Sequence, residues 1–289
     1  MMPGRQIDHC VLPTAGLDVA RKRLTALGFT VAPRGLHPFG TENCCVYFAD
    51  GTFLEPLAVA DQVKAGIASM RGNMFTARDA AFRYRLGDEG FSALVLGTED
   101  AAGDHRDFSR AGISAGRILN FSRPFVDAAG RSDTASFKLA FAADLRAPDA
   151  FFFTCQRVNA PAVDRSALQR HANGARRIKA IVLEAPEPED FAAFLRHVVR
   201  AMPEQTPDGL RFGAANGNVL VRRSAKPRGL PRPGLRLAEI VFGVESLAKV
   251  RSAFAAAAIR REAQPGRLTV APAAGQGAAF AFEALSSRG

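Results

Sequence analysis

The chain has 289 residues with a net charge of +10, and 47% of its residues are hydrophobic and 23% charged. This composition is typical of globular rather than disordered proteins, and the length suffices for two ordinary domains. No segment approaches the roughly 20 apolar residues that span a bilayer. The first ten residues, MMPGRQIDHC, lack the apolar core of a secretory signal. Four cysteines, two of them adjacent, do not form a disulfide framework, so we expect a reduced, cytoplasmic protein without membrane association.

The basic residues are mostly arginines spread along the chain, which contains no Trp and only two Tyr. Neither a basic helix nor an aromatic stacking surface is evident, so we expect no nucleic-acid binding. The excess of arginine and alanine is typical of a GC-rich bacterial genome.

The first predicted strand, IDHCVL at residues 7–12, places His9 within an apolar segment. A buried imidazole needs a partner. A backbone carbonyl would make His9 an ordinary core residue, whereas a metal ion would make it a ligand.

The elements that follow form a repeated unit of one strand, one helix and three strands. The first copy continues with a helix near residues 18–29 and strand-like segments up to Val59. Three further strand-like segments, at residues 91–100, 178–185 and 237–244, are each followed by a helix-like segment and so open three more copies. We therefore predict an α+β fold with four βαβββ units.

Pairing two such units lets their curved sheets enclose a shared cavity. We predict two paired half-barrel domains, residues 1–158 and 178–289, joined by a polar connector at residues 159–177. The first would carry the active cavity, and the second would be a degenerate copy.

Four segments carry a resemblance to a known group of proteins: IDHCVL, the stretch from His37 to Val59, FFFTCQ, and HANGARRI. They resemble the glyoxalase-like branch of the vicinal oxygen chelate superfamily, which includes glyoxalase I, extradiol dioxygenases and bleomycin-resistance proteins. The resemblance covers about residues 5–183. It implies a divalent metal, such as Zn, Ni, Mn or Fe, bound in the cavity by residues of the first and last strands of each unit.

In the first unit the positions that match metal ligands are His9 and Glu55. Glu55 would also lie among apolar neighbours, where a carboxylate needs a cation, an arginine or a proton. The resemblance implies that His9 and Glu55 are catalytic metal ligands and that Glu55 doubles as a general base. A direct His–Glu hydrogen bond or an Arg–Glu pair is the alternative.

The second unit offers weaker ligands, because Ala93 and Thr154 stand at the matching positions. Gln156 is predicted to complete the metal site and contact the substrate. Arg157 stands where relatives carry a histidine, and it is expected to bind an anionic substrate group.

Further site residues come from a predicted loop and from the second half. His37 and Asn43 precede a strand at the rim of the expected cavity, where they would either contact substrate or shape a turn. In the second half, Glu239 and Glu283 occupy the two ligand positions, where they could hold a hard cation, although pairing with Arg222 is the more ordinary outcome.

Two classes of function remain open. The first is a metal-dependent lyase or isomerase whose metal chelates two neighbouring oxygens of a small, anionic substrate. The second is a non-catalytic protein of the bleomycin-resistance kind that sequesters a small molecule. An extradiol-type dioxygenase ranks lower, because the aligned positions do not supply two histidines and one carboxylate. A monomer or homodimer is expected.

Overall fold

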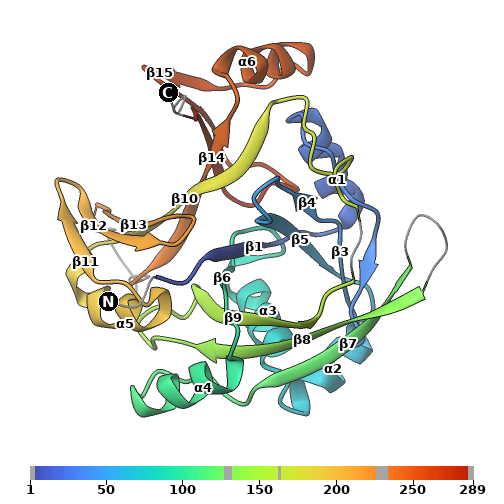
Figure 1. Ribbon diagram of the computed structural model, residues 1–289, viewed down its shortest axis with the longest axis vertical. Coiled ribbons are helices and arrows are strands. Elements are labelled where there is room, and N and C mark those ends of the chain that lie inside the picture. The colour runs from blue at the N-terminus through green and yellow to red at the C-terminus, as the bar shows by residue number, and fades with distance from the viewer. Residues whose placement is uncertain (1–3, 127–131, 162–163, 226–233, 286–289) are drawn as a thin grey trace.

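The computed structural model describes residues 4–126, 132–161, 164–225 and 234–285. Its strands form two sheets, one from the first 159 residues and one from Ala175 onward (Figure 1). The two sheets repeat one topology, which confirms the predicted α+β fold of βαβββ units.

The first sheet has the strand order β2-β3-β5-β1-β6-β9-β8-β7, with β4 paired to β5. At its centre, β1 is parallel to β5 and antiparallel to β6, and β6 is parallel to β9. The bounds are β1 (Ile7–Pro13), β2 (Gly35–Leu36), β3 (Thr41–Asn43), β4 (Val46–Tyr47), β5 (Phe53–Val59), β6 (Ala93–Gly97), β7 (Leu119–Val126), β8 (Ser132–Ala142) and β9 (Phe151–Asn159).

The second sheet has the order β11-β12-β13-β10-β14-β17-β16-β15. Its centre repeats the first, since β10 is parallel to β13 and antiparallel to β14, and β14 is parallel to β17. The bounds are β10 (Ala175–Ala185), β11 (Pro203–Thr206), β12 (Gly209–Ala214), β13 (Gly217–Arg223), β14 (Arg236–Val244), β15 (Glu262–Gln264), β16 (Arg267–Val270) and β17 (Ala279–Ala284).

A helix follows the first strand of each unit, as predicted. These helices are α1 (Leu17–Ala26), α4 (Ala101–Arg110), α5 (Ala192–Val199, preceded by the 3-10 turn η1, Pro188–Phe191) and α6 (Leu247–Ala256).

Two further helices, which the sequence analysis did not anticipate, lie between the first and second units. They are α2 (Gln62–Met70) and α3 (Met74–Leu86). The side chains of Asp61 and Asn73 cap them by accepting hydrogen bonds from Lys64 N and Thr76 N.

The main core lies between the two halves and is rich in phenylalanine. The rings of Phe29 and Phe48, from the first half, contact Phe242, at centroid distances of 5.2 and 5.5 Å. Phe280 and Phe282 lie 5.0 and 5.2 Å from the same ring. The two halves therefore share one hydrophobic core rather than folding around separate ones.

The opposite face of the first sheet carries a second, smaller core. Val11, Leu57 and Phe153 point to this face, and Phe75 of α3 packs against them. We call this side of the first sheet the inner face, because the candidate site lies on it.

The connector between the sheets is anchored by His171 and Asn173. His171 accepts a hydrogen bond from Thr30 N at Nδ1 and donates one from Nε2 to Tyr47 O, and Gly174 N donates to His171 O. Asn173 Nδ2 donates to Leu27 O. Residues 171–174 form a turn packed on the first half. We propose that the connector separates two units, residues 1–158 and 178–289, which share the main core.

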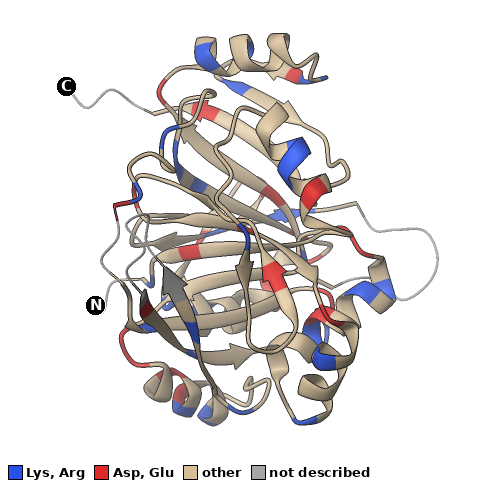
Figure 2. Cartoon of the chain, turned by 90° about the vertical axis from the view of Figure 1, so that its right-hand side faces the viewer, with Lys and Arg blue, Asp and Glu red and all other residues tan. Residues whose placement is uncertain are grey.

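Figure 2 shows that basic and acidic residues alternate along the helices and strands of both halves rather than gathering in one element. The four cysteines are free and buried. In the described part of the chain, no helix combines the length and apolar character needed to cross a membrane.

Candidate metal centre

His9 lies on β1 and points to the inner face, where its ring is fixed on two sides. Its Nδ1–H donates to Asp8 Oδ2 at 2.7 Å, because a carboxylate can only accept. Phe53 stacks on the ring at a centroid distance of 4.3 Å. The bond to Asp8 fixes the orientation of the imidazole and leaves Nε2 directed towards Glu55, at 3.4 Å from Oε2.

Glu55, on β5, lies between two histidines. His37 Nε2 is 3.5 Å from Oε1, and Asn43 Nδ2 donates to the same oxygen at 2.7 Å. His37 is held in turn by Thr41, whose Oγ1 is 2.9 Å from Nδ1. The structure thus brings together four of the predicted site residues, His9, Glu55, His37 and Asn43, all of which are buried.

The electrostatics of this cluster follow from the groups that surround each charge. Burial alone would raise the pKa of Glu55, but His9, His37 and Asn43 together lower it to about 2. Burial opposes a charge on His9, yet its hydrogen bonds to Asp8 and Glu55 raise its pKa. Burial lowers the pKa of His37 to about 4. At neutral pH Glu55 is therefore ionised and His37 is neutral.

These side chains fit a divalent metal in their chemistry. Two imidazole nitrogens and one carboxylate are the donors that first-row metals use, and adjacent donors about 2.1 Å from one metal lie about 3.0–3.4 Å apart. The His9–Glu55 contact of 3.4 Å lies at the upper end of this range, and the His37–Glu55 contact of 3.5 Å lies just beyond it. As they stand, however, the histidines face different oxygens of Glu55, and within the described ranges no three His, Cys, Asp or Glu side chains are arranged to hold an ion. Metal binding would require the two imidazoles to draw together.

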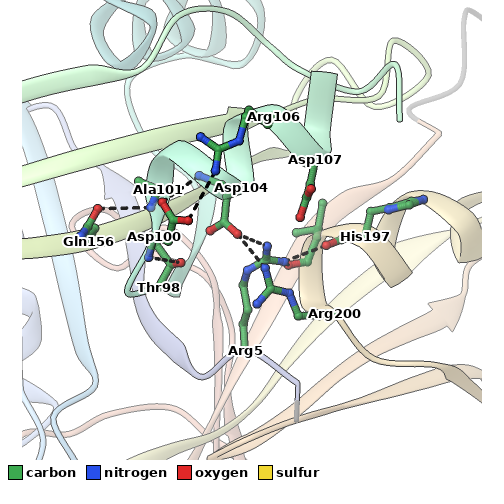
Figure 3. Close-up of polar contacts among 12 residues, drawn as sticks. Arg5, Thr98, Asp100, Ala101, Asp104, Arg106, Asp107, Gln156, His197 and Arg200 are labelled. Carbon is green, nitrogen blue, oxygen red and sulfur yellow. Dashed lines mark hydrogen bonds and ion pairs between the residues drawn. The ribbon is translucent and has the colours of Figure 1, made fainter. Parts of the chain in front are cut away.

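The structure does not bring Gln156 to this centre. Its Oε1 accepts from Ala101 N at 3.2 Å and its Nε2 donates to Glu99 O at 2.7 Å, at the start of α4 (Figure 3). On β9 the side chains alternate, and Phe153 and Cys155 rather than Gln156 belong to the inner-face core. The geometry therefore gives no support to Gln156 as a metal ligand or substrate contact.

Arg157 lies near the centre but is already paired. Its guanidinium donates to Asp8 Oδ1 and lies 5.8 Å from the Phe53 ring. It neutralises the carboxylate that orients His9, which differs from the predicted role of binding an anionic substrate group.

A small cavity adjoins the centre on the inner face. Val11 and Leu57, two residues beyond His9 and Glu55 on their strands, line it together with Phe75 and Phe153. It has about 10 Å³ of free space, room for about one water molecule. A larger ligand would have to displace side chains of α3.

The matching region of the second half is filled by ion pairs. Arg267 binds both Glu239 and Glu283, at 2.5 and 2.6 Å. Arg222 approaches Glu239 to 3.4 Å, as expected, and Lys179 Nζ is 2.5 Å from Glu283. Each carboxylate of this cluster is paired with basic side chains, and among the described residues of the second half no three His, Cys, Asp or Glu side chains are grouped to hold a metal ion.

The sequence analysis missed two residues near the centre, Asp8 and Arg123. Asp8 had a signal, because a carboxylate beside a buried histidine can orient its ring. Arg123 had none, because no strand was predicted where β7 lies.

Comparison with known proteins shows the family. The model of the glyoxalase-like domain matches residues 7–199, two-thirds of the chain. The chain belongs to the glyoxalase-like family. Solved structures of the vicinal oxygen chelate superfamily share its fold, whereas no curated protein matches its sequence.

Three solved structures illustrate the similarity in fold. A hypothetical protein from Staphylococcus aureus has a TM-score of 0.67 at 12% identity, covering 97% of this chain and 99% of that one. A mutant 4-hydroxymandelate synthase from Streptomyces coelicolor has a TM-score of 0.64 at 13% identity, covering 100% and 95%. A Mn(II)-bound glyoxalase from Novosphingobium aromaticivorans has a TM-score of 0.53 at 12% identity, covering 97% and 83%. At these identities the likeness concerns the fold alone.

Proposed function

We propose that this member of the glyoxalase-like family is a divalent-metal-dependent enzyme that binds a small substrate through two neighbouring oxygens. The observation that carries the proposal is the position of Glu55 between His9 and His37, at 3.4 and 3.5 Å from their Nε2 atoms. These three residues would hold the metal. Burying them together is costly unless a cation or a proton network compensates.

Asp8 and Asn43 prepare the site for such an ion. Asp8 keeps His9 Nε2 directed at Glu55, and Asn43 occupies Oε1, which leaves Oε2 as the carboxylate oxygen on the His9 side. A bound divalent metal would supply Lewis-acid stabilisation of charge on a chelated oxygen. Binding would displace a proton from His9, so metal affinity should fall as the pH is lowered.

Two reaction types are compatible with this donor set. A pair of histidines with one carboxylate favours the iron-dependent oxygenase alternative. A lyase or isomerase requires a proton acceptor, and in this donor set Glu55 would already be engaged as a ligand. The residues around the centre therefore raise the dioxygenase alternative above the rank that the sequence suggested.

Metal content of the purified protein tests the proposal directly. The parent and the variants His9→Ala, His37→Ala and Glu55→Gln would be analysed for Fe, Mn, Ni and Zn, and melted with and without each metal. We expect about one metal per chain in the parent, stabilisation by the preferred metal, and loss of both in all three variants. Gln156→Ala is the matched control and should retain the metal.

The alternative function, non-catalytic binding of a small molecule, predicts a different result. The direct contacts of Glu55 with His9, His37 and Asn43 would then be complete in themselves. A parent that contains no metal, and whose melting temperature no added metal changes, would contradict the enzyme proposal and favour the binding protein.

Asp8 provides a second, more specific prediction. In Asp8→Asn the carboxylate that accepts the His9 proton is lost, so the imidazole is less firmly oriented. We expect metal affinity to fall about 10- to 100-fold, measured by competition with a chromogenic chelator. Arg157→Gln should have a smaller effect, because it removes only the guanidinium that binds Asp8 Oδ1 and leaves the bond between Asp8 Oδ2 and His9 in place. Equal affinities in Asp8→Asn and the parent would show that Asp8 does not position His9.

A further inference from the structure

We propose that Arg123 binds a carboxylate group of the substrate beside the His9–Glu55–His37 centre, so that the protein selects small carboxylic acids. The inference rests on the proposed function for the identity of the centre, and it adds the class of molecule that the centre takes.

The position of Arg123 follows from its contact with Gly35. A side chain at residue 35 would place its Cβ 2.5 Å from Asn43 Oδ1 and 2.7 Å from Arg123 Nη1. Both atoms therefore border the space that a Cβ would fill at Gly35. Because each lies so close to the same point, Asn43 Oδ1 and Arg123 Nη1 are at most 5.2 Å apart. Asn43 binds Glu55 through its other polar atom, at 2.7 Å. The guanidinium thus lies one side chain away from the carboxylate of the centre.

The direction of β7 supports this placement. Phe121 precedes Arg123 by two residues, so their side chains share one face of the strand. The Phe121 ring lies 5.9 Å from His37 and 5.3 Å from Phe39. That face is therefore the inner face of the first sheet, and the Arg123 guanidinium lies over Phe137, 5.9 Å from its centroid.

Among the described residues, no carboxylate is paired with the positive charge of Arg123. In the part of the chain that the structure describes, no Asp or Glu lies within ion-pair distance of it. Arg157, by contrast, is paired with Asp8. The positive charge of Arg123 also acts on the buried Cys45 thiol. Burial raises the pKa of this thiol, and the charge of Arg123 opposes that rise.

The charges around the centre indicate what Arg123 would bind. Arg157 is paired with Asp8, whereas Arg123 has no carboxylate partner among the described residues. Arg123 therefore adds a positive charge without an ion-pair partner to a partly buried site. A guanidinium fork matches a planar carboxylate through two parallel hydrogen bonds, and such bonds are stronger than those to neutral oxygens. A substrate with a carboxylate beside its chelating oxygens would use both groups.

Oxamate and oxamide provide a matched pair of probes, because they have nearly the same shape and differ in one negative charge. We would measure their affinities for the parent, Arg123→Gln and Arg123→Lys by calorimetry, in the metal-loaded and the chelator-treated protein. We expect the parent to prefer oxamate, Arg123→Gln to bind oxamate at least about tenfold more weakly with oxamide unchanged, and Arg123→Lys to be intermediate. Arg106→Gln, a substitution within α4 where Arg106 faces Asp100, should behave as the parent.

The outcomes separate this inference from the proposed function. Normal metal content in Arg123→Gln together with loss of the preference for oxamate supports the carboxylate site. A parent without metal would contradict the proposed function, yet a preference for oxamate that depends on Arg123 would still support the carboxylate site. A parent that does not bind oxamate, or does not distinguish it from oxamide, would contradict the inference, as would an Arg123→Gln variant that binds oxamate like the parent.

Discussion

Replacing Phe242 with alanine should lower the free energy of unfolding by about 3–5 kcal/mol, because the ring fills the centre of the core that the two halves share. Phe242 is fully buried on β14 and contacts Phe29 and Phe48 of the first half as well as Phe280 and Phe282 of its own. Its removal leaves a cavity lined by rings from both halves. We therefore expect a single, cooperative unfolding transition at a lower urea concentration.

Chemical denaturation would measure this effect. Circular dichroism would follow the whole chain, and a spectroscopic probe placed in each half would follow the unfolding of that half. Leu145→Ala is the control, since Leu145 is 96% exposed and its truncation should change stability by less than about 0.5 kcal/mol. If Phe242→Ala unfolded the second half first and left the first half folded with its metal centre intact, the halves would be independent domains and the shared core would have no structural importance.

Much of the fold could be predicted because its repeated unit has a clear pattern. An apolar strand followed by an amphipathic helix recurs four times, and β1, β6, β10 and β14 begin the units at the expected places. The insertion α2–α3 could not be derived in this way. No side chain of α2 is buried, so its sequence lacks the apolar stripe that reveals a packed helix.

The candidate site was predictable where it depends on local sequence and not where it depends on strand register. His9 and Glu55 stand out as costly groups in apolar strands, and the structure places them together. Gln156 was placed on the same face by aligning Thr154 with Glu55. In β9, however, Phe153 pairs with Val95 and faces inward, which turns Thr154 and Gln156 to the other face. An offset of one residue reverses every side chain of a strand.

His37 shows a third case, in which the loop was recognised but the position of its side chain was not. His37 and Asn43 were expected at the rim of the cavity, where they would either contact substrate or shape a turn. The hairpin of β2 and β3 instead carries it inward, where Phe39 stacks on its ring at 5.1 Å and Thr41 holds Nδ1. Whether His37 lies at the rim or points inward depends on the pairing of β2 with β3. The sequence of the loop alone does not reveal that pairing.

His171 should make the protein sensitive to acid. Burial lowers its pKa from 6.5 to about 4, because the ring packs between Phe29 and Phe48 and its Nδ1 must stay unprotonated to accept the hydrogen bond from Thr30 N. The unfolded chain binds this proton more tightly than the folded one. Its contribution to stability is therefore complete above about pH 6.5 and is lost as the pH falls towards 4. Allowing for its partial exposure, we expect a loss of about 2 kcal/mol from this residue.

Comparison of the parent with His171→Gln in chelator-treated protein isolates this contribution from the metal centre. Urea unfolding at pH 7.5 should show the variant to be less stable, since glutamine cannot reproduce both bonds of the ring. At pH 4.5 most of that difference should vanish, because the parent has by then lost the advantage of its neutral imidazole. His197→Gln, an exposed substitution on α5, should change stability equally little at both pH values. A difference between parent and His171→Gln that stays constant from pH 7.5 to 4.5 would mean that His171 does not titrate with unfolding, and that the junction between the halves is held by Asn173 and the shared core alone.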